Sequence, residues 1–295
     1  MASYLFKLTG QALNLTGHVS PAAAGNLAFR LFSRTPGGKP TNHKEKALLA
    51  ATRARMAEGV RTDLSIGANR TVAAYRFAPL GAANGKTLLV VHGWGSRIAY
   101  LQTLITGLRQ AGFAVVGLDL PGHGQSSGRN LTVPLALAGI RAAWDHLGPF
   151  DAVVGHSFGG FVSAMATALP AEYGQAIEPG RLVLIAAPAT ASSAFDHFGS
   201  MLGLKSKTRL ALDHRVERIA GRPTTFFDAA GMLSDRANLP VLVLHAEDDR
   251  EVKADAARRY DRAGDHVTLR WTNGLGHRRI VQSQEVITAI TDFLV

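Results

Sequence analysis

The stretch Gly155-His156-Ser157-Phe158-Gly159-Gly160 has the pattern G-x-S-x-G, and it separates two segments of different character. The preceding Ala152-Val153-Val154 is a short apolar run typical of a buried strand, and a helical pattern follows the pair Gly159-Gly160. A serine on such a sharp turn needs small residues two positions before and after it, which Gly155 and Gly159 provide. The pattern predicts that Ser157 is an exposed nucleophile, with a glycine-rich turn carrying an inactive serine as the alternative.

Short apolar runs alternate with helical patterns along most of the chain. Runs of this length are typical of strands buried on both faces of a parallel sheet. The runs are Leu88–Val91, Ala114–Leu118, Ala152–Val154, Leu182–Ile185, Val241–Leu244 and Val267–Leu269. A hairpin is predicted ahead of them, with its turn at Gly67–Arg70. The alternation predicts an α/β fold with a mostly parallel, doubly wound sheet and helices on both faces.

The chain divides into three predicted segments. Residues 1–60 form an N-terminal helical extension, of which residues 1–34 are expected to pack on the main body. Residues 61–189 and 240–295 form the α/β core. Residues 190–239 contain no strand pattern and have an apolar, helical composition. Because this interval is too long for an ordinary connection, it is predicted to be a helical lid.

Composition limits the classes of function. Hydrophobic residues make up 46% and charged residues 18%, as in soluble globular enzymes. There is no cysteine, which excludes disulfides and thiolate chemistry within the chain. The net charge is +10, but no dense basic run or nucleic-acid-reading motif accompanies it, so we expect no nucleic-acid partner.

The N-terminal region carries no strong targeting signal. It lacks the roughly 20 mostly apolar residues of a membrane span, and its weak apolar region makes a poor secretory signal. A cytoplasmic location is therefore expected. Packing of residues 1–34 onto the core is favoured over peripheral attachment to a membrane, and the alternative is open to a liposome test. The sequence does not predict the oligomeric state.

A serine nucleophile needs a base and an acid. His277 lies in the stretch Gly274-Leu275-Gly276-His277, just after the last predicted strand. In a parallel sheet the end of this strand is expected to lie beside the turn that carries Ser157, here called the elbow. The stretch His245–Val252 follows the predicted strand before the last one and offers several acids. If the acid comes from this stretch, the three residues occur along the chain in the order nucleophile, acid, histidine. This order is typical of enzymes whose serine lies on a turn between a strand and a helix.

The developing oxyanion needs two backbone N–H donors. One is expected from Phe158, the residue after the nucleophile, and the other from Trp94 in the loop His92-Gly93-Trp94-Gly95. The glycines of this loop let the backbone approach a substrate closely. The indole ring of Trp94 either lines the acyl pocket or packs in the core.

Together these segments resemble the α/β-hydrolase superfamily, in particular its lid-bearing esterase, lipase and serine-peptidase-like branch. The resemblance covers about residues 61–295. It rests on the loop His92–Gly95, the stretch Asp119–Ser126, the elbow Gly155–Gly159, and the acid and histidine segments. It implies that Asp119–Ser126 is a structural loop, so Asp119 and His123 receive no catalytic role.

The resemblance also selects the acid. The family spacing G-x-x-D-x-x-V is matched by Ala246, Asp249 and Val252, with alanine in place of the glycine. Asp249 is therefore preferred over Asp248.

The predicted function is hydrolysis of a carboxylic ester of a small molecule through an acyl-enzyme, without a metal or organic cofactor. A lid rich in Phe, Leu and Met favours a small or medium apolar acyl group. Ser157 in the elbow disfavours the branches with an aspartate nucleophile. Peptide, lactone, thioester or carbon–carbon cleavage and perhydrolysis stay open, as does a non-catalytic ligand-binding protein on the same scaffold.

Overall fold

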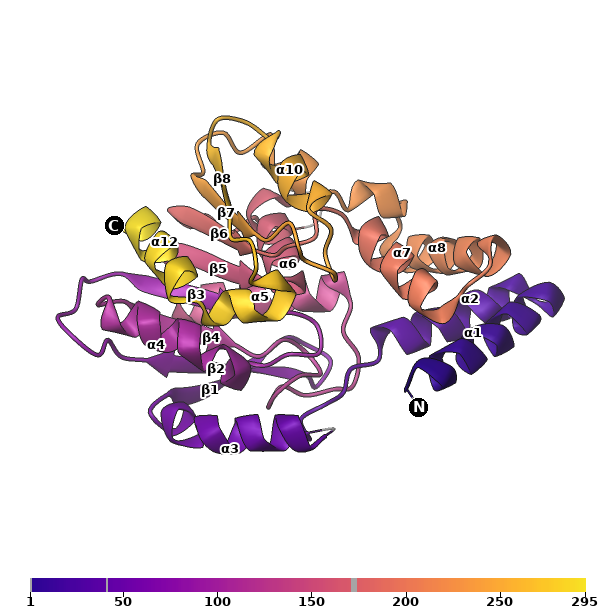
Figure 1. Cartoon of the computed structure of the whole chain (residues 1–295), viewed down its shortest axis with the longest axis horizontal. Helices are drawn as coiled ribbons and strands as arrows, with labels where there is room; N and C mark the ends of the chain where they lie inside the picture. Colours follow the sequence, from indigo (N-terminus) through magenta and orange to yellow (C-terminus); the bar gives the residue numbers. More distant parts are fainter. Residues whose placement is uncertain (1, 41, 171–173) are drawn as a thin grey trace. The chain divides into compact units, whose positions relative to one another are not determined.

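A computed structural model of the chain describes residues 2–40, 42–170 and 174–295. It divides the chain into two compact units. One, here called the helical unit, consists of Met1–Arg34 and Thr190–Asp228; the other, the core unit, consists of Thr35–Ala189 and Ala229–Val295. Figure 1 labels the strands and most of the helices of the two units.

The core unit is built on an eight-stranded sheet with the order β1-β2-β4-β3-β5-β6-β7-β8. Its strands are β1 (Val60–Ser65), β2 (Thr71–Phe77), β3 (Thr87–Val91), β4 (Ala114–Leu118), β5 (Ala152–His156), β6 (Arg181–Ile185), β7 (Val241–His245) and β8 (Val267–Trp271). β2 is antiparallel to β1 and β4, and the six strands from β3 to β8 are parallel to one another. This confirms the predicted doubly wound α/β fold, because each predicted apolar run lies in one of these strands.

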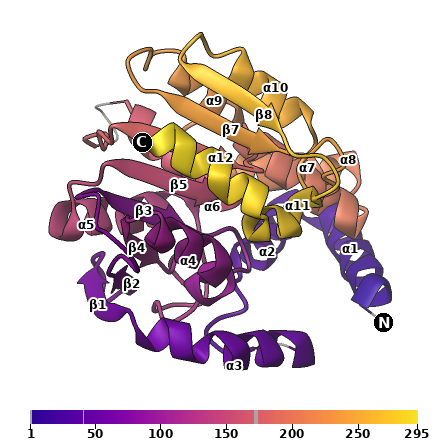
Figure 2. The ribbon, with the colours of Figure 1, turned by 60° about the vertical axis from the view of Figure 1, so that its left-hand side comes forward.

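Helices cover both faces of the sheet (Figure 2). The helical elements of the core unit are α3 (His43–Ala57), η1 (Ile98–Leu101), α4 (Gln102–Gln110), α5 (Val133–Leu147), α6 (Phe158–Ala168), α9 (Ala229–Leu233), α10 (Asp255–Asp261), α11 (Gly276–Arg279), η4 (Ile280–Gln282) and α12 (Gln284–Leu294). The apolar stripes of α4 and α12 join buried strand residues in one core cluster. α5 is capped at its N-terminus by Thr132, whose side chain accepts a hydrogen bond from the N–H of Leu135.

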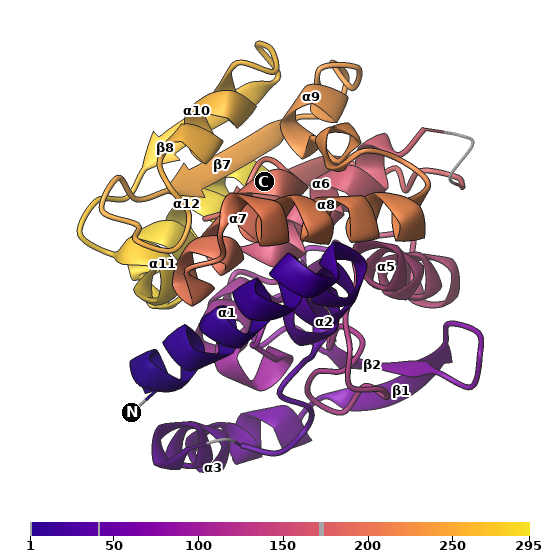
Figure 3. The ribbon, with the colours of Figure 1, turned by 90° about the vertical axis from the view of Figure 1, so that its right-hand side faces the viewer.

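The helical unit contains α1 (Ala2–Val19), α2 (Pro21–Ser33), α7 (Ala191–Leu202), α8 (Ser206–Ala220) and η3 (Thr224–Phe226). α2 packs along α8, and α1 contacts α2, α7 and α8 (Figure 3). Glycines permit this close packing, because a Cβ on Gly10 would collide with the carbonyl oxygen of Leu202 and one on Gly25 with that of Ala211. No helix in the described ranges combines the length and apolar character needed to cross a bilayer.

The units divide the chain differently from the predicted segments. The predicted extension is split at Arg34: the helices before it group with the inserted segment, whereas α3 belongs to the core unit. The core unit also resumes at Ala229, ahead of residue 240, because α9 packs against α6. A helical pattern shows which face of a helix is buried but not which partner buries it.

Candidate active site

Ser157 lies on a strained turn between β5 and α6. Its backbone has φ 54° and ψ −127°, a conformation that L-residues rarely adopt. A Cβ on Gly155 would lie 2.5 Å from the Cα of Gly160, and one on Gly159 would collide with the carbonyl oxygen of His92. Both glycines of the motif are therefore required for the turn.

Ser157, His277 and Asp249 are joined by two hydrogen bonds. The Nε2 atom of His277 is 2.9 Å from Ser157 Oγ, and its Nδ1 atom is 2.8 Å from Asp249 Oδ2. The three residues follow β5, β8 and β7, whose carboxyl ends lie at one edge of the sheet. With Nδ1 donating to the carboxylate, Nε2 is left to accept the Ser157 proton.

Asp249 is the acid that contacts His277. Its Oδ1 atom accepts hydrogen bonds from the N–H groups of Glu251 at 2.8 Å and Val252 at 2.9 Å. Burial raises the pKa of the Asp249 carboxyl, but the hydrogen bonds from His277 and the two N–H groups outweigh it and hold the pKa below its usual value. Asp248 instead accepts a hydrogen bond from the N–H of Gly274 at 2.9 Å.

His156 supports the loop that carries His277. The Nε2–H group of His156 donates to the carbonyl oxygen of His277 at 2.9 Å, and the two rings lie 5.1 Å apart. Burial lowers the pKa of His156 to about 4, so the ring is neutral near pH 7. Sequence reasoning placed His156 in the elbow but missed this role; the signal was a histidine directly before the nucleophile.

Two further neutral histidines hold the loop after β3. His92 donates from Nδ1 to the carbonyl oxygen of Gly93 at 2.7 Å and accepts at Nε2 from the N–H of Leu120 at 2.9 Å. His123 accepts at Nε2 from the N–H of Gly95 at 2.9 Å. Burial lowers the pKa of His92 to about 4 and that of His123 to about 3. His123 therefore has a positioning role, consistent with its assignment to a structural loop.

The predicted oxyanion donors lie on the two segments that flank the nucleophile. Phe158 is the first residue of α6, where backbone N–H groups have no partner within the helix. The Trp94 and Phe158 rings meet edge to face at 5.6 Å and are both partly exposed. A Cβ on Gly93 would lie 2.8 Å from the Cβ of Ser157, so the Trp94 loop runs directly beside the serine.

Asp119 lies in the loop after β4 and does not contact His277. Its buried carboxylate accepts hydrogen bonds from the N–H groups of Ile98 at 2.8 Å and Gln125 at 3.0 Å. Burial raises its pKa. The carboxylate thereby ties its own loop to the start of η1.

A model of the α/β hydrolase family matches residues 88–289 of this chain. The chain belongs to the α/β-hydrolase family. Over an alignment of 138 residues, which covers 39% of this chain and 37% of the relative, the chain is 35% identical to the dihydrolipoyllysine-residue acetyltransferase component of the acetoin cleaving system of Cupriavidus necator. Over an alignment of 94 residues, which covers 30% of this chain and 28% of the relative, it is 33% identical to a serine hydrolase-like protein of Danio rerio.

A solved structure extends the likeness in fold to most of the chain. The esterase Pf2001 of Pyrococcus furiosus superposes with a TM-score of 0.60 over 88% of this chain and 98% of its own, at 20% identity. At 20% identity, the comparison shows a shared fold only. The curated relatives, in contrast, are matched over well under half of their length.

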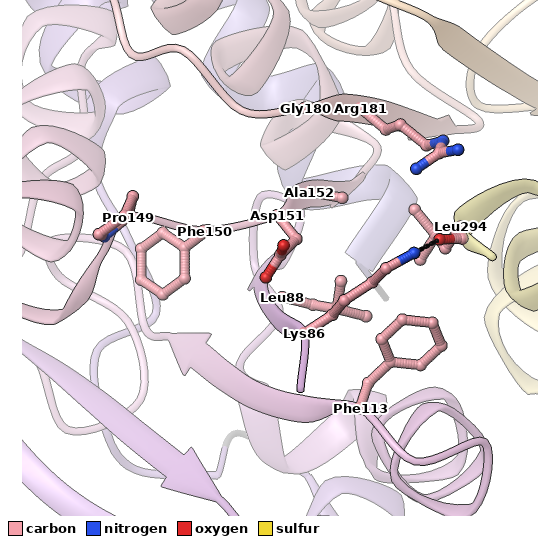
Figure 4. Close-up of a pocket in the computed structure, with 10 residues that line it drawn as sticks. All are labelled: Lys86, Leu88, Phe113, Pro149, Phe150, Asp151, Ala152, Gly180, Arg181 and Leu294. Atoms are coloured by element: carbon pink, nitrogen blue, oxygen red, sulfur yellow. Dashed lines mark hydrogen bonds between the residues drawn. The ribbon is translucent and has the colours of Figure 1, made fainter. Parts of the chain in front are cut away.

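A cavity of about 290 Å³ lies elsewhere on the core unit of this hydrolase (Figure 4). Its lining includes the first residues of β5 and β6, Ala152 and Arg181, whereas Ser157 follows the other end of β5. The ammonium group of Lys86 at its wall donates to the carbonyl oxygen of Leu294 at 2.7 Å. The cavity is therefore separate from the serine site.

Because the buried histidines are neutral in the folded protein, we expect the free energy of unfolding to decrease in weak acid. In the unfolded chain the pKa of a histidine is about 6.5, whereas His92, His123 and His156 have pKa values of about 4, 3 and 4 in the folded protein. Below about pH 6.5 the unfolded state binds protons that the folded state does not, so the free energy of unfolding decreases as the pH falls towards about 4. We expect the Tm to fall by about 5 °C or more between about pH 7 and pH 5 in circular-dichroism melts.

The control for this prediction is His123→Gln. Glutamine does not titrate, so the variant should show a smaller difference in Tm between the two pH values, whatever its absolute stability. An equal or larger difference would mean that His123 does not contribute to the acid sensitivity.

Proposed function

We propose that this hydrolase cleaves carboxylic esters through an acyl-enzyme formed on Ser157. The observation that supports the proposal most strongly is the hydrogen-bonded series Asp249–His277–Ser157, which ends on a serine at φ 54°. A hydroxyl at its normal acidity is a weak nucleophile, and an adjacent base held by a carboxylate is the arrangement that activates it.

In the proposed mechanism, Ser157 Oγ attacks the ester carbonyl while Nε2 of His277 takes its proton. Asp249 keeps the required tautomer and stabilises the imidazolium. The backbone N–H groups of Phe158 and Trp94 bind the oxyanion of the tetrahedral intermediate. His277 then protonates the leaving alcohol, and a water molecule, deprotonated by the same ring, hydrolyses the acyl-enzyme.

The surroundings of Ser157 favour a neutral, apolar ester. The partly exposed rings of Trp94 and Phe158 present apolar surface beside the nucleophile. The nearby cations are already engaged: Arg278 pairs with Glu251 at 2.7 Å, and Arg279 donates to backbone carbonyl groups. These arginines therefore give no reason to expect an anionic substrate.

The proposal is tested by measuring release of p-nitrophenol from esters with acyl chains of two to twelve carbons. We expect saturable turnover, with the preferred chain length reporting the size of the acyl site. If no ester is hydrolysed, ester cleavage is wrong as a proposal, and peptide, lactone and thioester substrates become the next candidates. Tight binding of an ester without turnover would instead favour a ligand-binding protein on a hydrolase scaffold.

Gly93→Ala is expected to lower kcat by about 100-fold, because small displacements of reacting groups have effects of this size. The added Cβ would lie 2.8 Å from the Cβ and 3.3 Å from Oγ of Ser157. It would displace either the serine or the loop that carries Trp94. The measurement is the rate of p-nitrophenyl butyrate hydrolysis at saturating substrate.

Gly81→Ala is the matched control, since the nearest atom to its added Cβ outside the adjoining residues would be the carbonyl oxygen of Gln110, at 3.6 Å. It should retain the wild-type rate. Wild-type activity in Gly93→Ala with an unchanged Tm would contradict the close approach of this loop to the nucleophile.

A further inference from the structure

Exposed apolar side chains are concentrated in the helical unit. This unit holds about a quarter of the chain but contributes most of the large hydrophobic residues that are exposed among those the structure describes. They are Phe6, Leu8, Leu15, Val19, Leu27, Met201, Leu210 and Ile219. Isolated exposed leucines are ordinary on protein surfaces, but such a concentration in one unit is typical of an interaction surface.

Four of the exposed residues of α1 lie on one face of the helix. Leu8, Ala12, Leu15 and Val19 are spaced by four, three and four residues, which places them in one stripe. Leu15 is 69% exposed and Val19 is 90% exposed. We call these four residues the α1 stripe.

The opposite face of α1 makes the contacts within the helical unit. Leu13 is buried, and a Cβ on Gly17 would lie 2.6 Å from the hydroxyl oxygen of Thr208. The side chain of Asn14 donates to the carbonyl oxygen of Gly203 at 2.9 Å and accepts from the N–H of Lys205 at 2.9 Å. The helix is therefore fixed by one face, and the α1 stripe points away from these partners.

Charge indicates which partner suits the α1 stripe. Helices α1 and α2 contain no Asp or Glu, and the helical unit as a whole has nine Lys and Arg against four Asp and Glu. This excess of five positive charges is half of the net charge of the chain. A second copy would bring two such positive units together, whereas an anionic lipid surface complements them.

We propose that helix α1 binds the surface of anionic phospholipid bilayers. In this arrangement α1 lies in the plane of the interface, with Leu8, Leu15 and Val19 among the upper acyl chains. Basic side chains of the helical unit, such as Lys7, face the phosphate groups. The sequence alone favoured packing of this segment on the core, and the exposure of the α1 stripe is the observation that changes the interpretation. The proposal goes beyond ester hydrolysis and does not depend on it.

The test is co-sedimentation of the full-length protein with vesicles. Wild type is expected to bind vesicles of phosphatidylcholine mixed with phosphatidylglycerol more strongly than vesicles of phosphatidylcholine alone, and to be released by about 0.5 M salt. The double variant Leu15→Glu/Val19→Glu is expected to lower the partition coefficient by about tenfold or more, because two apolar side chains no longer insert.

Leu80→Glu is the matched control, because Leu80 is 50% exposed in the core unit. It should bind vesicles as wild type does, and circular dichroism should show that all variants are folded. Equal vesicle binding by the double variant and wild type would overturn the proposal. The proposal would also be overturned if wild type bound neither kind of vesicle and eluted as a dimer while the double variant eluted as a monomer. The α1 stripe would then pair with a second copy.

Discussion

Replacing Ser157 with alanine is expected to lower kcat for p-nitrophenyl ester hydrolysis by a factor on the order of 10⁴ to 10⁶. The substitution removes only Oγ, the atom that lies 2.9 Å from Nε2 of His277. Among the described residues, no other hydroxyl group is hydrogen-bonded to that ring. Initial rates for equal concentrations of wild type and variant give the ratio, and a mass spectrum after a short reaction shows whether the wild type carries the acyl group.

Ser163→Ala is the control for this experiment. Ser163 is buried in α6, and its hydroxyl has no hydrogen-bond partner among the described residues. Its loss should therefore leave the rate unchanged and the stability equal or slightly higher. Retention of more than a few per cent of the wild-type rate by Ser157→Ala would show that another group performs the attack.

The sheet was predictable because its strands carry their own signal. Continuous apolar runs such as Val241–Leu244 are buried on both faces, and each one corresponds to a strand whose bounds differ by only a few residues. The elbow was predictable for a different reason: the turn at Ser157 leaves no room for side chains at Gly155 and Gly159. Steric constraints of this kind fix residue types at fixed spacing.

The parts that were not predicted depend on contacts between distant segments. Nothing in the sequence of α1 and α2 indicates that they group with α7 and α8. Gly10 and Gly25 allow a close approach of another helix, but they do not indicate which helix approaches. The hydrogen bond from His156 to the carbonyl oxygen of His277 joins residues 121 positions apart, and no periodic pattern in the sequence indicates it. Fold follows from local patterns here, whereas the support of the site follows from tertiary packing.

Asp249→Asn is expected to lower kcat by a factor on the order of 10⁴ while leaving the fold intact. The amide oxygen of asparagine can still accept the hydrogen bonds from the N–H groups of Glu251 and Val252. Its NH₂ group then faces Nδ1 of His277, which must become an acceptor. The proton moves to Nε2, and the ring is no longer able to take the proton of Ser157.

Asp248→Asn separates this effect from a general loss of negative charge in the same loop. Asp248 is one residue away and accepts from the N–H of Gly274, a bond that the amide oxygen of asparagine preserves. Its rate should stay within a few-fold of wild type, measured on the same ester at the same pH. If Asp248→Asn lost the larger factor, the acid would be assigned to the wrong neighbour; if both variants were fully active, His277 would act without a carboxylate partner. The hydrogen bond of 2.8 Å between Asp249 and His277 is the reason to expect neither result.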